Sequence, residues 1–172
     1  MSDFKEGSVI WLTGLAGSGK SYIASHLYET LKQRYKNVLY LDGDEFRDIL
    51  GDFSYDKQGR LELSFKRATF ANFLSKQGMI VIVSAISMWN EIYEYNRKNI
   101  KNYFEIYVKC DFDELLRRDK KHLYSKALNK ELLNVVGIDI AFDEPKPDLL
   151  LDNTNFIALD TKLDTILEKI GL

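Results

Sequence analysis

A glycine-rich segment at residues 14–21, with the sequence G-L-A-G-S-G-K-S, constrains the fold of this 172-residue chain more than any other feature. It follows the apolar run V-I-W-L at residues 9–12 and precedes a helical pattern over residues 22–34. The segment matches G-x-x-x-x-G-K-[ST], in which glycines let backbone N–H groups turn toward a phosphate and the next helix adds its N-terminal donors. The sequence therefore predicts a strand, a loop and a helix that together cradle the phosphates of a nucleoside triphosphate.

The residues of this loop have individual expected roles. The ammonium of Lys20 is expected near the β- and γ-phosphates, and the hydroxyl of Ser21 can ligate Mg²⁺. A glycine-rich turn that only caps a helix is the alternative, but the agreement of strand, loop and helix favours the phosphate cradle. The residues expected to bind ATP here are Gly14, Leu15, Ala16, Gly17, Ser18, Gly19, Lys20 and Ser21.

Further apolar runs of strand length follow at residues 38–41, 79–83, 104–108 and 149–151. Most are continuously apolar, which is typical of parallel strands covered on both faces. Helical patterns fill the gaps, including apolar residues at three- and four-residue spacing from Trp89 to Tyr103 and from Leu159 to Ile170. We therefore expect a single α/β domain over residues 1–172, with a doubly wound, five-stranded parallel sheet and helices on both faces.

Composition and charge exclude several classes of protein. The formal net charge is −2, so nucleic-acid binding through a generally basic surface is not expected. No apolar run reaches the length of a membrane-spanning helix, and residues 1–7 lack the pattern of a signal peptide. Cys110 is the only cysteine and is interpreted as a packing residue, because it cannot form a disulfide within the chain. These features predict a cytoplasmic protein with no membrane partner.

The type of phosphate-binding protein follows from what the chain lacks. It contains no N-K-x-D element for reading guanine, and it is too short for a large ATP-driven machine. A kinase acting on a small molecule is the leading class, and a non-catalytic nucleotide sensor is the alternative from a different class.

Two carboxylates, Asp42 and Asp44, directly follow the apolar run at residues 38–41. The carboxyl ends of parallel strands line the ligand crevice, where a carboxylate can hold Mg²⁺ through water or accept a proton from an attacking hydroxyl. A helix that begins here would carry Asp44 and Arg47 on one edge. Either aspartate could instead cap that helix. We expect a chemical role for Asp44.

The longer motifs resemble those of the adenylylsulfate (APS) kinase family, which phosphorylates the 3′-hydroxyl of adenosine 5′-phosphosulfate with MgATP. The resemblance runs from Gly7 to about Thr154. It rests on W-L-T-G-L-A-G-S-G-K-S at 11–21, L-D-G-D-x-x-R at 41–47, F-S at 53–54, I-V-I-V-S-x-I-S at 80–87, R-D-x-K-x-L-Y-x-K-A at 118–127 and G-I-D-x-x-[FY]-[DE]-x-P at 137–145. The resemblance implies ATP and Mg²⁺ as cofactors, a small nucleotide as acceptor and a homodimer.

The resemblance also implies a role for each matching residue. Asp44 matches the catalytic aspartate and, with Ser21, is an expected Mg²⁺ ligand, while Lys20 is expected to act on the transferred phosphoryl group. Ser87 is the third candidate catalytic residue, because the family's proposed phosphoserine lies at its position, although we expect direct in-line transfer. The residues expected to bind the acceptor are Asp42, Arg47, Phe53, Arg60, Ile86, Ser87, Lys121 and Phe142, with the two phenylalanines stacked on its base.

A basic segment occupies residues 117–130, which contain six lysines and arginines against one acidic residue. The segment matches the family's mobile lid, here at about residues 117–137, and Arg118 matches an arginine that stacks on the donor adenine. A solvated helix face is the alternative for any single lysine in this segment. We interpret the two histidines, His26 and His122, as structural or solvent-facing.

The sequence departs from the family pattern on the acceptor side. The usual F-S-x-x-D-R-x-E-N-I-R-R becomes F-S-Y-D-K-Q-G-R-L-E-L-S-F-K at residues 53–66, which places Gly59 and Leu63 where Asp and Asn are expected. The usual S-P-[YH]-R becomes S-M-W-N at residues 87–90. Since the donor motifs are intact, we expect a changed acceptor. Cytidine diphosphoramidate, the substrate of a family branch that serves capsule modification, is favoured over APS.

Overall fold

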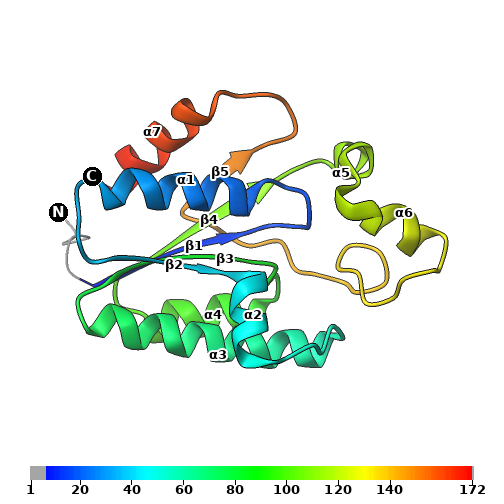
Figure 1. Cartoon of the computed structure of the whole chain (residues 1–172), viewed down its shortest axis with the longest axis horizontal. Coiled ribbons are helices and arrows are strands. Elements are labelled where there is room, and N and C mark those ends of the chain that lie inside the picture. The colour runs from blue at the N-terminus through cyan, green and yellow to red at the C-terminus, as the bar shows by residue number, and fades with distance from the viewer. Residues whose placement is uncertain (1–6, 172) are drawn as a thin grey trace.

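A computed structural model describes residues 7–171, and its centre is a five-stranded sheet in which every pairing is parallel (Figure 1). The strands are β1 (Ser8–Thr13), β2 (Val38–Asp42), β3 (Ile80–Ala85), β4 (Tyr103–Lys109) and β5 (Leu149–Asp152). Their order across the sheet is β2-β3-β1-β4-β5. The structure confirms the predicted fold class, and each of the predicted strands is present with small shifts at its ends.

Helices cover both faces of the sheet (Figure 1). One face carries α1 (Lys20–Lys32) and α7 (Leu159–Ile170), and the other carries α3 (Lys57–Lys76) and α4 (Asn90–Asn99). The short α2 (Gly43–Leu50) follows β2, while α5 (Phe112–Arg118), a 3₁₀ turn (Lys120–His122) and α6 (Leu123–Leu128) follow β4. The helical pattern expected from Trp89 to Tyr103 ends at Asn99, because Tyr103 already begins β4. Within the described chain, no helix is long and apolar enough to cross a lipid bilayer.

Side chains of β1 alternate between two apolar layers. Ile10 and Leu12 pack in the layer of α1 and α7, whereas Val9 and Trp11 pack in the layer of α3 and α4. All four side chains are fully buried. Burial on both faces explains why this strand is continuously apolar in sequence rather than alternating with polar residues.

The carboxyl ends of the central strands meet at one edge of the sheet. Thr13, the last residue of β1, lies opposite Ala85 of β3, and Asp42 of β2 lies opposite Ser84. The connection from β1 passes through α1 on one face, and the connection into β3 passes through α3 on the other face. Open α/β sheets bind their ligands at the carboxyl ends of the strands, next to such a reversal.

Candidate active site

The loop between β1 and α1 has the backbone conformation of a phosphate cradle. Gly14, Gly17 and Gly19 have positive φ angles of 155°, 79° and 96°. A side chain at Gly14 would also lie 2.5 Å from the carbonyl oxygen of Val108, and one at Gly19 would overlap the side-chain amide of Asn153. Glycine is therefore required at these positions, and the loop curls as its sequence predicts.

Lys20 is buried at the start of α1, and its ammonium donates a hydrogen bond of 3.4 Å to the carbonyl oxygen of Leu15. Burial and the charge of Lys120 lower the pKa of Lys20 to about 8, although the carboxylates of Asp44 and Asp42 act in the opposite direction. The ammonium therefore keeps its charge at neutral pH. It forms no ion pair with a carboxylate of the described residues, so the charge is free to meet a phosphate held in the loop.

The two carboxylates after β2 have different surroundings. One carboxylate oxygen of Asp42 caps α2 by accepting the backbone N–H groups of Asp44 and Glu45, at 3.0 and 3.3 Å. The other accepts the hydroxyls of Tyr40 and Ser84 at 2.9 and 3.1 Å. Although burial acts to raise it, these hydrogen bonds hold the pKa of Asp42 below its ordinary value. Asp44 makes no such bond within the described chain and lines a cavity, so it is the carboxylate left free for chemistry.

Ser21 belongs to the hydrogen-bond network of Asp42. Its hydroxyl lies 3.3 Å from the hydroxyl of Ser84, which in turn donates to the Asp42 carboxylate. Hydroxyl and carboxylate oxygens are the ligands that Mg²⁺ prefers. The charges of both Asp42 and Asp44 act on Lys20, so both carboxylates lie near the phosphate loop. The donor set at this edge of the sheet therefore fits the expected Mg²⁺ ligands Ser21 and Asp44.

A small cavity of about 50 Å³ opens beside Asp44. Three arginines line it, Arg47 from α2 and Arg60 and Arg67 from α3, and Ile86 from the segment after β3 completes the wall. Neither Arg60 nor Arg67 forms an ion pair with a carboxylate of the described residues. With three guanidinium groups against one carboxylate, the cavity suits an anionic ligand.

Tyr55 contacts two of these arginines in the loop between α2 and α3. Its ring centroid lies 4.5 Å from the guanidinium carbon of Arg47 and 5.4 Å from that of Arg60. Arg47 also donates hydrogen bonds to the carbonyl oxygens of Asp52 and Ser54, at 3.0 and 2.9 Å. Arg60 donates to the carbonyl oxygen of Tyr55 at 2.6 Å. These contacts hold the loop against the cavity.

A larger, mostly apolar cavity of about 370 Å³ adjoins the small one. Tyr55, Arg60 and Ile86 line both cavities, and residues 132–136 form much of the remaining wall of the larger one. Arg60 joins the two sides by donating a hydrogen bond of 2.9 Å to the carbonyl oxygen of Asn134. An apolar cavity that adjoins a cationic one fits a ligand with a planar base at one end and an anionic tail at the other.

The two phenylalanines expected to stack on the acceptor base lie outside these cavities. Phe53 is 63% exposed, and Phe142 packs against the buried cluster that contains Trp89. Neither ring lines either of these two cavities, and the two rings do not stack on each other in the described structure. The structure therefore does not bring Phe53 and Phe142 together, whereas Tyr55 lines both cavities.

Ile86 and Ser87, the two residues after β3 that are expected to bind the acceptor, differ in whether they reach the cavities. Ile86 lines both of them, as an acceptor contact would. Ser87 is fully buried, and its hydroxyl lies 2.8 Å from that of Ser64, which donates to the carbonyl oxygen of Arg60 at 2.7 Å. The side chain of Ser87 contributes no surface to either cavity, so this geometry gives no support to the expected chemical role of Ser87.

A third cavity, of about 520 Å³, lies beside the phosphate loop and is lined by Arg118 and by residues 153–157. Arg118 donates hydrogen bonds to the carbonyl oxygens of Gly17 at 3.1 Å and Asn153 at 2.6 Å. Hydrogen bonds from Arg117 and Arg118 hold the pKa of Glu114 at about 2, so this carboxylate stays charged and fixes both arginines. Arg118 thus contacts the phosphate loop and also lines this cavity, which lies where the adenine of a nucleotide bound to the loop is expected.

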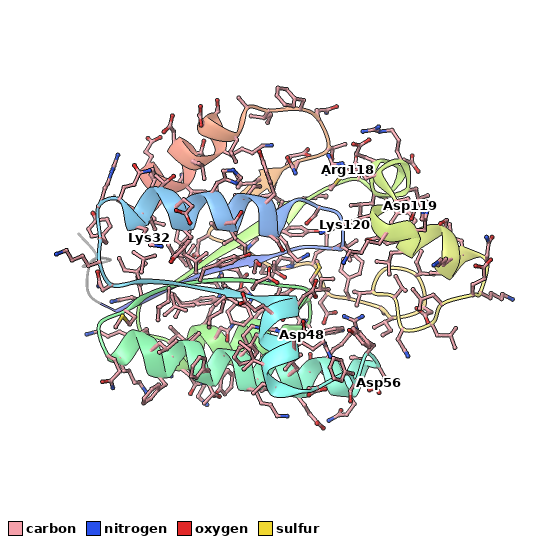
Figure 2. All side chains as sticks on the ribbon, viewed as in Figure 1. Lys32, Asp48, Asp56, Arg118, Asp119 and Lys120 are labelled. Carbon is pink, nitrogen blue, oxygen red and sulfur yellow. The ribbon has the colours of Figure 1, made fainter. Side chains whose placement is uncertain are left out.

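Neighbouring lysines of the basic segment have different positions. The Cβ atom of Lys120 lies 4.0 Å from the point where a side chain at Gly17 would begin, and after burial its charge is the next cause that lowers the pKa of Lys20. Figure 2 shows Lys120 and Arg118 near the end of α1 that carries the loop. Lys121, the lysine that we expected to bind substrate, is exposed and lines none of the three cavities.

Among the departures from the family pattern that were expected to alter acceptor contacts, Leu63 lines the small cavity. Gly59 is required by packing, since a side chain there would overlap the loop that precedes α3. Met88 and Trp89 are buried, and the Trp89 indole donates a hydrogen bond of 3.0 Å to the carbonyl oxygen of Ala141. These last two residues therefore support the segment that carries Phe142 rather than contacting the acceptor.

Three residues of this site are not marked by any motif: Tyr55, Arg67 and Lys120. Tyr55 lies in the stretch at residues 53–66 that departs from the family pattern, and Arg67 directly follows that stretch. For Arg67 a signal exists, because it follows Arg60 by seven residues and so falls on the same face of a helix. Lys120 lies within a run of basic residues, and the sequence pattern gives no reason to choose it over its neighbour Lys121.

Comparison with known proteins agrees with this geometry. A model of the adenylylsulphate kinase family matches residues 6–152. A cytidine diphosphoramidate kinase of Campylobacter jejuni is 59% identical over 164 residues, which cover 95% of this chain and 96% of that protein. An adenylyl-sulfate kinase of Bacillus velezensis is 40% identical over 152 residues, which cover 86% and 77%. The Mycobacterium tuberculosis APS kinase, solved in complex with AMPPNP and APS, superposes with a TM-score of 0.87 at 31% identity, covering 97% of this chain and 99% of that one.

Proposed function

The chain belongs to the adenylylsulphate kinase family, and on that premise we propose that it transfers the γ-phosphoryl group of ATP to the 3′-hydroxyl of a 5′-activated nucleotide. The favoured acceptor is cytidine diphosphoramidate, and APS is the weaker alternative. One observation carries the proposal: the cationic cavity at Asp44 shares Tyr55, Arg60 and Ile86 with the larger apolar cavity. A nucleotide fits this pair, with its ribose and anionic tail in the first cavity and its base in the second.

Two further findings favour the cytidine compound over APS. The relative that is 59% identical is a cytidine diphosphoramidate kinase, whereas the adenylyl-sulfate kinase is 40% identical. In addition, Leu63 lines the acceptor cavity where the APS kinase pattern has an asparagine. Losing an amide hydrogen bond costs about 1–3 kcal/mol if its partner stays buried and unpaired. A cavity without that amide suits an acceptor that differs from APS.

ATP is the proposed donor because the phosphate loop and the cavity beside Arg118 adjoin each other. Lys20 would bind the β- and γ-phosphates, and Ser21 and Asp44 would hold Mg²⁺. The metal ion, when bound, supplies positive charge that offsets the negative charge of the phosphates.

Asp44 is the residue proposed to accept the proton of the 3′-hydroxyl. It is the carboxylate that lines the small cavity, and no hydrogen bond within the described chain engages it. A positioned general base contributes on the order of 10²–10⁴-fold in rate. Lys20 would stabilise the charge that develops on the transferred group and on the departing diphosphate. Because positioning and charge stabilisation suffice for this chemistry, the transfer needs no covalent intermediate.

Steady-state kinetics with saturating MgATP would test the acceptor. We expect kcat/KM for cytidine diphosphoramidate to exceed that for APS by at least about tenfold, which corresponds to about 1.4 kcal/mol of differential transition-state binding. Phosphorus NMR should place the new phosphate on the 3′-oxygen. Lys20→Ala is the control for ADP released by a contaminating enzyme. Efficient turnover of APS with none of the cytidine compound would make the protein an ordinary APS kinase, and ATP binding without acceptor-dependent ADP release would favour the sensor.

The proposal includes one kinase domain that works in the cytoplasm as a homodimer, with residues 117–137 as its lid. Support for the lid comes from sharp backbone reversals between α5 and α6, where Asp119, Lys121 and His122 have φ angles of 31°, 59° and 56°. Sedimentation velocity at micromolar concentration tests the dimer, and protection of this segment from proteolysis by MgATP and acceptor tests the lid.

A further inference from the structure

Arg67 of α3 is a buried charge in the wall of the small cavity for which the proposed reaction has no use. The residue is 3% exposed. Its Nη2 donates a hydrogen bond of 3.1 Å to the carbonyl oxygen of Gly43, and its guanidinium carbon lies 5.3 Å from the ring centroid of Phe46. Within the described chain, its buried Nε–H has no hydrogen-bond partner and no carboxylate pairs with its charge.

An arginine in this state is costly in the empty protein. Burial, followed by the charge of Arg47, lowers the pKa of Arg67 to about 10, although the charges of Asp42 and Asp44 act in the opposite direction. A buried guanidinium without an ion-pair partner loses hydration that one backbone hydrogen bond replaces only in part, and an unpaired buried N–H adds a second cost. An anion that accepted the Nε–H would remove both costs at once. The surroundings of Arg67 therefore favour an anionic ligand.

The other two arginines of this cavity and Ser64 are already engaged by the protein. Arg47 donates to backbone carbonyls of the loop before α3 and lies 3.9 Å from the carboxylate of Asp52. Arg60 donates to two backbone carbonyls. Ser64 donates to a backbone carbonyl of its own helix, and Leu63 has no donor. Arg67 is more buried than Arg47 and keeps an unused N–H.

We propose that Arg67 determines acceptor specificity by donating its Nε–H to the terminal tetrahedral anionic group of the acceptor's 5′ tail. This inference deepens the proposed function and rests on it, since the small cavity must be the acceptor site. Phosphoryl, phosphoramidate and sulfuryl groups all present anionic tetrahedral oxygens, although the phosphoramidate carries nitrogen in place of one of them. Arg67 therefore reads the presence of a terminal group on the tail, whichever base the acceptor carries.

Binding of matched nucleotide pairs tests the tail separately from the base. Calorimetry measures affinities for CMP and CDP, and for AMP and APS, with the donor site filled by MgADP. Wild-type protein is expected to bind the member with the terminal group more tightly in its preferred pair. Arg67→Met is expected to weaken binding of that member by at least about tenfold, and to change binding of the monophosphate by less than about twofold.

Two further variants separate binding from folding. Arg67→Lys keeps a positive charge and most of the bulk, so it replaces the Met variant if that variant does not fold. Since lysine lacks the Nε–H, it is expected to lose at least about threefold of the preference for the terminal group. Arg97→Met is the matched control, because Arg97 is an arginine of α4 that pairs with Glu105 and Asp148. It is expected to lower Tm and to leave the preference unchanged.

Three results would overturn the role of Arg67. They are an unchanged tail preference in both Arg67 variants, an equal loss of affinity for both members of a pair, and a wild-type protein that shows no tail preference in either pair. Failure of the proposed acceptor gives a different result, in which the adenosine pair binds more tightly than the cytidine pair in wild type and variants alike.

Discussion

The hydroxyl groups of Ser64 and Ser87 lie 2.8 Å apart, and both residues are at most 1% exposed. Because this contact engages Ser87 inside the protein, we expect Ser87→Ala to lower kcat by less than about tenfold, the effect of one internal hydrogen bond of about 0.5–1.5 kcal/mol. Labelled ATP should leave no acid-stable phosphate on the protein. Ser64→Ala is the matched control, since it removes the other half of the same contact. A labelled serine would contradict direct transfer.

Lys20→Ala is expected to abolish phosphoryl transfer. The variant loses the charge that meets the β- and γ-phosphates where the transition state needs it. Lys32→Ala, at the other end of the same helix, is the control and should retain wild-type turnover because this lysine is exposed and contacts Tyr28. Both variants are assayed for ADP release at saturating MgATP and acceptor. Near-normal turnover of Lys20→Ala would mean that the loop is not the donor cradle.

Asp44→Asn is expected to keep the fold and ATP binding while kcat falls by about 10²–10⁴-fold, because the amide cannot accept the proton of the acceptor hydroxyl. Asp42→Ala should behave differently. It removes the cap of α2 and should cost about 0.5–2 kcal/mol of stability, which urea denaturation measures. If Asp44→Asn kept the wild-type kcat, the carboxylate would have no part in proton transfer.

Tyr55→Ala is expected to raise the acceptor KM more than Phe53→Ala does, because Tyr55 lines both cavities and Phe53 is 63% exposed. Loss of an aromatic contact to a base costs about 1–3 kcal/mol, so Tyr55→Ala should raise this KM about fivefold or more. The KM for ATP should stay constant in both variants. A larger effect of Phe53→Ala would show that Phe53 moves onto the acceptor base when the nucleotide binds.

Glu105 gives an expected pH dependence of stability. Burial raises the pKa of this carboxyl above its ordinary value of 4.5, although hydrogen bonds from Tyr103 and Arg97 oppose the shift. The folded protein therefore holds the proton to higher pH than the unfolded chain does. The free energy of unfolding should fall as pH rises from 4.5 through the raised pKa.

Urea denaturation of wild type and Glu105→Gln across this pH range checks the expectation. The glutamine variant cannot titrate at this position, so its stability should improve relative to wild type as pH rises. Glu94→Gln, on the exposed side of α4, is the control. Its free energy of unfolding should change with pH as that of wild type does. If the free energy of unfolding of wild type instead rose with pH relative to that of Glu105→Gln, the prediction would be wrong.

The fold and the donor half of the site could be predicted because their determinants are local in sequence. Because β1 is buried on both faces, its sequence is a continuous apolar run, which can be recognised without the structure. The phosphate loop is a single stretch, so its motif places Gly14, Lys20 and Ser21 relative to one another without knowledge of the rest of the chain. Asp42 could be located in the same way, since it directly follows an apolar run and ends β2, although only the structure separates its capping role from the free carboxylate of Asp44.

The acceptor half could not be predicted to the same extent, because it depends on contacts between distant segments. Arg60 bonds to a carbonyl oxygen 74 residues away, at Asn134, and no sequence pattern records such a pairing. In the loop before α3, Tyr55 lines the cavities whereas the expected Phe53 does not. The buried state of Arg67 depends in turn on Gly43 and Phe46 of another helix.

β1 is the central strand of the sheet, yet both strands that flank it, β3 and β4, are made later in the chain. On the ribosome, β1 therefore has no hydrogen-bonded neighbour until Ala85 has left the exit tunnel, and it lacks the second until Lys109 has followed. The phosphate-loop motif at residues 14–21 is therefore made well before the strand that anchors it can pair. An apolar strand that stays unpaired during synthesis is prone to aggregation, and we expect ribosome-associated chaperones to bind it.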